Sequence, residues 1–174
     1  MLSDELRFSR VVVIDDVASN LRLLESSLKT FSLVHVKTFS DSAAGLVWLQ
    51  ENPWDLLLLD LDMPTPNGFD ILQQLEPRDR SRSPVIIISA LSRAEDRRKG
   101  LEMGAQDYIS KPVDLSDLVL RVRNSLQLSL ASQNMHQERD QLEDLVKERT
   151  AQLNRSFQAL IRSLSRAAAY KDNE

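Results

Sequence analysis

Five polar side chains follow the short apolar runs of this sequence, and together they could support phosphoryl transfer. Asp15-Asp16 comes directly after one run, Asp60 after another, and Ser89 and Lys111 follow two more. Carboxylates that lie close together repel one another unless a hard cation neutralises them, and Mg²⁺ suits a site built from oxygen atoms. Asp60 could then attack phosphorus, while the Lys111 ammonium and the Ser89 hydroxyl bind phosphoryl oxygens.

These side chains can meet only if the apolar runs form neighbouring strands of one sheet. The runs alternate with segments of helical spacing, and the continuous ones are typical of parallel strands covered by helices on both faces. The sequence therefore predicts an α/β fold with a five-stranded, parallel, doubly wound (flavodoxin-like) sheet of order 2-1-3-4-5, whose ligands bind beyond the carboxyl ends of the strands. The predicted strands are Val11–Ile14, Leu33–Val36, Leu56–Leu59, Val85–Ile88 and Tyr108–Ile109.

Polar residues indicate where the helices between these strands begin. Side chains of Ser, Asp and Asn accept hydrogen bonds from the free N–H groups at a helix start, whereas Gly and Pro commonly follow a helix end. The predicted starts are Asp16, Ser40-Asp41, Asn67-Gly68, Ser92 and Asp114, and the predicted stops are Pro53 and Gly104.

The order and spacing of these motifs resemble the receiver domain of bacterial two-component response regulators, over residues 10 to about 123. Two local departures leave the acidic residues in place. Val17 stands where a further acidic residue is often found, and Pro66 stands where a flexible or apolar residue is usual. The matching strings are Val11–Asp16 with Asn20, Leu56–Pro64 with Gly68, Pro84–Ala90, and Gly104–Pro112.

The resemblance implies a phosphorylation site and a Mg²⁺ site. A histidine kinase or a phosphotransfer protein would phosphorylate Asp60. The cation would be held by Asp15, Asp16, Asp60 and the backbone carbonyl of Asp62. Mg²⁺ is therefore the expected cofactor.

The resemblance also implies a conformational switch beside the phosphorylation site. Ser89 and Lys111 would assist the reaction, and Ser89 would act with Tyr108 as the switch pair. A cis peptide bond is implied in the Ser110-Lys111-Pro112 segment, with Pro112 as the cis-proline.

The pattern changes after Val122, because neither Gly nor Pro occurs from there to the end of the chain. A stripe of apolar or small residues with steps of three and four is typical of a coiled-coil seam, here with a stutter at Phe157 and with Arg149 in one slot. The predicted domains are thus a receiver over residues 1–123 and a coiled-coil signalling helix over 124–168, which pairs the chain as a homodimer. The stripe consists of Leu142, Val146, Leu153, Phe157, Leu160, Leu164 and Ala167.

The last residues resemble the opening helix of an HD-GYP cyclic di-GMP phosphodiesterase. The motif Glu148-Arg149-Thr150 followed by Leu153 is similar to helices that join receivers to output domains, and residues 169–174 would begin that truncated output domain. The only histidines, His35 and His136, cannot supply its metal site, so these 174 residues are not expected to be the phosphodiesterase itself.

Three alternatives can be compared with the receiver interpretation. A stand-alone receiver with a dimerisation helix fits the same motifs, whereas a receiver acting only as a scaffold has no support, because every phosphorylation residue is present. The string Leu56–Asp62 also resembles the first motif of haloacid dehalogenase-type phosphatases, with Asp60 as nucleophile and Asp62 as general acid. The acidic pair of those phosphatases usually lies downstream of the nucleophile, whereas Asp15-Asp16 lies upstream.

Composition excludes several other classes of protein. The absence of cysteine excludes thiol catalysis and thiolate metal sites. The formal net charge of -4 provides no basic surface for nucleic acid. No apolar run approaches the roughly 20 residues that span a bilayer, and the first residues lack the features of a signal peptide. We therefore expect a cytoplasmic protein without nucleic-acid or membrane partners.

Overall fold

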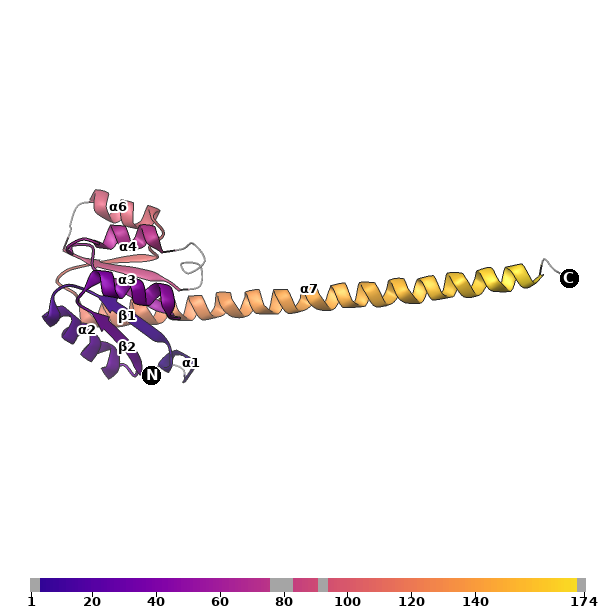
Figure 1. Ribbon diagram of the computed structural model, residues 1–174. Coiled ribbons are helices and arrows are strands. Elements are labelled where there is room, and N and C mark those ends of the chain that lie inside the picture. Colours follow the sequence, from indigo (N-terminus) through magenta and orange to yellow (C-terminus); the bar gives the residue numbers. More distant parts are fainter. Residues whose placement is uncertain (1–3, 76–82, 91–93, 172–174) are drawn as a thin grey trace. The chain divides into compact units, whose positions relative to one another are not determined.

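The computed structural model describes residues 4–75, 83–90 and 94–171, and these residues form a doubly wound α/β structure with a long final helix (Figure 1). All the strands pair in parallel, in the order β2-β1-β3-β4-β5, so the predicted fold class is confirmed. The elements are α1 (Asp4–Arg7), β1 (Arg10–Ile14), α2 (Ala18–Thr30), β2 (His35–Phe39), α3 (Ser42–Glu51), β3 (Leu56–Leu59), α4 (Gly68–Gln74), β4 (Val85–Ser89), α6 (Ala94–Glu102), β5 (Asp107–Ser110) and α7 (Leu115–Lys171).

The three central strands are buried on both faces, which explains their continuous apolar sequences. Alternate residues of a strand point to opposite faces, so each strand contributes to two separate cores. One core joins β1, β3 and β4 to α3 and α4 through Val12, Ile14, Leu57, Leu59, Val85, Ile87, Leu46, Leu49, Ile71 and Leu72. The other joins the same strands to α2 and α7 through Val11, Val13, Leu56, Leu58, Ile86, Ile88, Leu21, Leu24, Leu28, Leu118, Val122 and Leu126.

The second strand lies further along the chain than predicted. It was expected at Leu33–Val36, but β2 runs from His35 to Phe39. Leu33 is buried because the chain turns there, with Ser32 at a φ of 75° and the Leu33 N–H donating to the Leu28 carbonyl. The apolar character of this segment therefore reflects a packed turn rather than the strand itself.

The helix starts were mostly predicted correctly. Asp41 accepts hydrogen bonds from the first N–H groups of α3, Asn67 forms a capping box with Asp70 at α4, and Asp114 accepts from the first turn of α7. The start at Asp16 is wrong, because α2 begins at Ala18 and its N-cap residue Val17 makes no side-chain cap. The expected start at Ser92 lies outside the described residues.

The final helix is one continuous element that crosses the predicted boundary at residue 123. α7 has 57 residues, which agrees with the absence of Gly and Pro from this part of the sequence. The chain divides into two compact units, Met1–Ser132 and Gln133–Glu174. Among the described helices, none is both long enough and apolar enough to cross a membrane.

Candidate functional site

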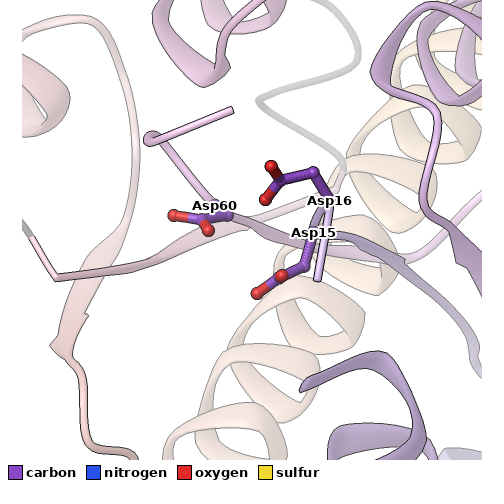
Figure 2. A group of neighbouring side chains, drawn as sticks. All are labelled: Asp15, Asp16 and Asp60. Carbon is purple, nitrogen blue, oxygen red and sulfur yellow. The ribbon is translucent and has the colours of Figure 1, made fainter. Parts of the chain in front are cut away.

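The predicted acidic residues lie together at the carboxyl ends of two neighbouring strands. Asp15 and Asp16 follow β1, and Asp60 follows β3, which pairs directly with β1. One carboxylate oxygen from each residue lies within 4.8 Å of the others. Figure 2 shows the three side chains as neighbours. Asp15 and Asp60 are buried, whereas Asp16 is exposed to solvent. The cluster is therefore open on the side of Asp16.

Lys111 joins two of these carboxylates from the end of β5. Its Nζ donates to Asp60 Oδ2 at 2.6 Å and to Asp15 Oδ2 at 2.8 Å. The lysine side chain is 20% exposed, while both carboxylates are almost fully covered. One ammonium group therefore partly neutralises two buried negative charges.

Asp60 is held in place by the backbone around it. Its N–H donates to the Ile14 carbonyl, and the Asp62 N–H donates to Asp60 Oδ1 at 3.1 Å. A Cβ atom at Gly68 would collide with the Asp60 carbonyl oxygen and lie 2.7 Å from the Leu61 Cα atom. Glycine therefore lets α4 begin directly against the residue that follows β3.

Burial and pairing have opposing effects on the charged groups. Burial raises the pKa of the Asp60 carboxyl above its usual value, although the hydrogen bonds from Lys111 and Asp62 act against this shift. Burial alone would lower the pKa of the Lys111 ammonium, but its hydrogen bonds and charge interactions with Asp15 and Asp60 raise it. Lys111 therefore stays protonated, while the buried Asp60 carboxylate lacks full compensation for its lost hydration.

Asn20 is part of this site, although the sequence indicated no role for it beyond its place in a motif. Its Nδ2 lies 3.0 Å from both oxygens of Asp15. The Val17 N–H donates to Asp15 Oδ1 at 2.9 Å. Asp15 is thus held by an amide, a backbone N–H and Lys111 together. A search of the sequence for charged residues would not identify Asn20, because its side chain is a neutral amide on the helix that follows the acidic pair.

The two expected switch residues lie on adjacent strands and are both buried. Ser89 ends β4 and is fully covered, and its carbonyl accepts from the Lys111 N–H at 2.9 Å. Tyr108 of β5 is 8% exposed and belongs to the core on the α3 and α4 side of the sheet. The Arg97 guanidinium lies 5.9 Å from the centre of its ring. The Tyr108 ring therefore occupies an inward position in this structure.

Two proline peptide bonds near the site are cis. They are Lys111–Pro112, where the sequence implied one, and Thr65–Pro66, where it implied none. Asp62, whose backbone carbonyl was expected to hold the cation, lies two residues after Asp60 and is exposed to solvent.

The donor set suits Mg²⁺. The three side chains offer carboxylate oxygens, the ligand type that Mg²⁺ prefers, and the exposed Asp16 leaves room for the waters that this ion usually keeps. Crowded carboxylates at the ends of buried strands also favour a compensating cation.

Comparison with known proteins decides the family. The family model described as "Response regulator receiver domain" matches residues 11–123. The chain belongs to the response regulator receiver family. The string Leu56–Asp62 is therefore part of a receiver, and the haloacid dehalogenase alternative is set aside.

Curated relatives share the receiver region. "Response regulator PleD" of Caulobacter vibrioides is 36% identical over 130 residues, which cover 74% of this chain and 28% of that protein. A protein of Vibrio cholerae named "Probable cyclic di-GMP phosphodiesterase" is 29% identical over 175 residues, covering 100% of this chain and 39% of that protein. The chain thus spans well under half the length of these relatives.

Solved structures share the receiver fold. The receiver domain of DrrB from Thermotoga maritima, activated with BeF3, is 30% identical with a TM-score of 0.63, covering 69% of this chain and 98% of that one. A receiver domain protein from Methanospirillum hungatei is 22% identical with a TM-score of 0.66, covering 71% of this chain and 98% of that one. At this identity the similarity is one of fold alone.

Proposed function

We propose that residues 1–123 form a receiver in which Asp60 accepts a phosphoryl group from a histidine kinase or a phosphotransfer protein. The observation that carries this proposal is the buried Asp60 carboxylate, 2.6 Å from Lys111 Nζ and beside Asp15 and Asp16. In a receiver, this arrangement supplies both a nucleophile and the positive charge that the incoming phosphoryl group needs.

The residues of the site have distinct parts in this reaction. An Asp60 carboxylate oxygen attacks the phosphorus atom while the bond from phosphorus to the donor's imidazole nitrogen breaks and the imidazole leaves. The Lys111 ammonium turns from the Asp60 carboxylate to a phosphoryl oxygen, and the Ser89 hydroxyl donates to another phosphoryl oxygen.

Mg²⁺ is the expected cofactor of this reaction. Asp15, Asp16, Asp60 and the backbone carbonyl of Asp62 would hold it. When bound, it supplies positive charge that offsets the carboxylates and the phosphoryl oxygens. The chain's own contribution is to keep these oxygens close together before the donor arrives.

Labelling with a small phosphodonor tests this reaction. Acetyl phosphate with Mg²⁺ should add one phosphoryl group to the protein, and beryllofluoride with Mg²⁺ should occupy the same site. EDTA should prevent both, because the crowded carboxylates need the cation. Labelling that proceeds equally well in EDTA would contradict the proposed metal-dependent mechanism.

Ser89 and Tyr108 form the switch in this proposal. A phosphoryl group on Asp60 would draw the Ser89 hydroxyl toward it and shift Tyr108 from an exposed position to the inward position that it occupies in this structure, which alters the surface formed by α6, β5 and the start of α7. Ser89→Ala should therefore permit labelling but weaken the response of that surface. NMR shifts of α6 and β5 that do not change when beryllofluoride binds the wild type would contradict the switch.

The helical segment of residues 124–168 pairs the chain as a parallel homodimer. Five seam residues are at least 60% exposed on the single chain, although each is apolar: Leu142, Val146, Leu153, Phe157 and Leu160. Burying such a stripe against a second helix removes apolar surface from water, which supports a coiled coil. Sedimentation with and without phosphodonor distinguishes a constitutive dimer from one that depends on phosphorylation.

The coiled coil is proposed to lead to an HD-GYP cyclic di-GMP phosphodiesterase domain, whose first residues would be 169–174. The alignment of the whole chain, including the helix, with the Vibrio cholerae phosphodiesterase supports this assignment. The side chains of residues 169–174 lie outside the described part. A stop codon after Glu174, or a different output domain encoded there, would contradict the assignment and leave the receiver proposal unaffected.

A further inference from the structure

Asn20 touches the acidic cluster without carrying a charge. It lies in the first turn of α2, and its side-chain amide is 3.0 Å from each oxygen of Asp15. The Asn20 backbone N–H already donates to the Val17 carbonyl at 2.9 Å. The side chain is therefore not needed to satisfy the start of the helix.

Helix stability does not explain an asparagine at this position. Asn is a weaker helix former than Ala. Its amide also makes no cap for α2, whose N-cap Val17 has no side-chain hydrogen bond. The contact with Asp15 is thus the interaction that the amide provides.

The other partners of Asp15 do not replace this contact. Lys111 is shared between Asp15 and Asp60, so its bond to Asp15 weakens when the ammonium turns to a phosphoryl oxygen. The Val17 N–H reaches Asp15 Oδ1 alone. The Asn20 amide reaches both oxygens from the first turn of α2.

We propose that Asn20 is a positioning residue that orients the Asp15 carboxylate and thereby sets the affinity of the acidic cluster for a divalent cation. This inference rests on the proposed function, in which Asp15 is a Mg²⁺ ligand. Groups that hydrogen-bond to metal ligands fix the orientation of those ligands, and their removal commonly weakens metal binding by about 10- to 100-fold.

Calorimetric titration of the full chain with Mg²⁺ tests the role of Asn20. Asn20→Ala should weaken Mg²⁺ binding by about tenfold. The cation-free variant should unfold at a somewhat lower temperature than the wild type, because the buried Asp15 carboxylate loses a donor, but it should remain folded at the temperature of the titration. Asn52→Ala is the matched control, since the Asn52 amide is also partly buried but donates to the Trp48 carbonyl at 3.0 Å, at the end of α3. It should bind Mg²⁺ like the wild type.

Labelling separates positioning from a direct role in the chemistry. With acetyl phosphate, Asn20→Ala should need about tenfold more Mg²⁺ for half-maximal labelling and should reach the wild-type rate when Mg²⁺ saturates. A lower rate at saturating Mg²⁺, with the half-maximal concentration unchanged, would overturn the positioning role.

A measurement on the wild type makes the test independent of the folding of the variant. The Asn20 side-chain amide resonances should shift on addition of Mg²⁺, while those of Asn52 should not. Unmoved Asn20 resonances in a protein that binds Mg²⁺, or equal Mg²⁺ affinity in Asn20→Ala and the wild type, would overturn the inference. A wild type that binds no Mg²⁺ would instead contradict the proposed function.

Discussion

The two units of this chain use the same kinds of apolar side chain in opposite ways. In the first unit, Leu58 of β3 is fully buried between helices that the chain itself supplies. In the second unit, Leu153 of α7 is 69% exposed. The first unit buries its apolar residues internally, whereas the apolar stripe of the second is exposed and, in the proposed dimer, is buried against a second copy of the chain. An apolar pattern thus indicates that a surface will be covered but does not identify the partner.

The largest expected effect is loss of the dimer. Replacing Leu142, Val146 and Leu160 with serine should convert the dimer into a monomer, because the three side chains occupy the exposed stripe. Light scattering at micromolar concentration reports the mass. Serine at Asp140, Asp144 and Gln158, which lie off the stripe, should leave the dimer intact. A monomeric wild type, or a triple variant of unchanged mass, would refute the pairing.

A matched pair of leucine substitutions compares the two units directly. Leu58→Ala should lower the free energy of unfolding of the receiver by about 2–5 kcal/mol, since it opens a cavity in a core that is fully packed. Leu153→Ala should change the free energy of unfolding of the receiver by less than about 0.5 kcal/mol, because that side chain lies in the second unit and is not part of the receiver core. Urea unfolding followed by tryptophan fluorescence measures both. Equal losses of unfolding free energy in the two variants would contradict the assignment of Leu58 to a closed core and of Leu153 to a surface outside it.

The smallest effect concerns a polar contact of the first unit. Arg10 donates two side-chain hydrogen bonds to Asp55, and although burial opposes the shift, these bonds and the Arg10 charge hold the Asp55 pKa below its usual value. A lowered folded-state pKa means that the stabilisation is present above the unfolded pKa and is lost as the pH falls through the folded value. Asp55→Asn should therefore cost about 0.2–1 kcal/mol at neutral pH, because the pair is partly exposed to solvent, which screens its charges.

The pH dependence of the same variant provides its control. The difference between wild type and Asp55→Asn should shrink as the pH is lowered through the Asp55 pKa, since the protonated carboxyl no longer pairs with Arg10. Urea unfolding at a series of pH values measures this difference. A difference that grows toward acid pH would show that the ion pair is not the cause.

The parts of the fold that depend on burial were predictable from the sequence. β3 was predicted at its observed bounds, because a strand buried on both faces must be apolar throughout. The helix caps at Asp41 and Asn67 were also predictable, since capping is a local interaction. Leu33 misled the prediction of β2 because a buried turn and a buried strand have the same apolar character.

The charged members of the candidate site were predictable from the sequence. The family motifs indicated Asp15, Asp16, Asp60 and Lys111, and the structure brings these four together. The amide of Asn20 was not singled out, because an uncharged residue on a helix has many ordinary roles. Its contact with Asp15 depends on where α2 begins, and that start was mispredicted.

Intact-mass spectrometry after treatment with acetyl phosphate and Mg²⁺ tests the central claim most directly. Wild type should gain one phosphoryl group, and Asp60→Asn should gain none, because only Asp60 combines the β3 end with contacts to Lys111 and the acidic pair. Asp41→Asn, which replaces another aspartate and preserves the α3 cap, should be labelled like the wild type. An Asp60→Asn protein that gains the phosphoryl group as fully as the wild type would contradict the account.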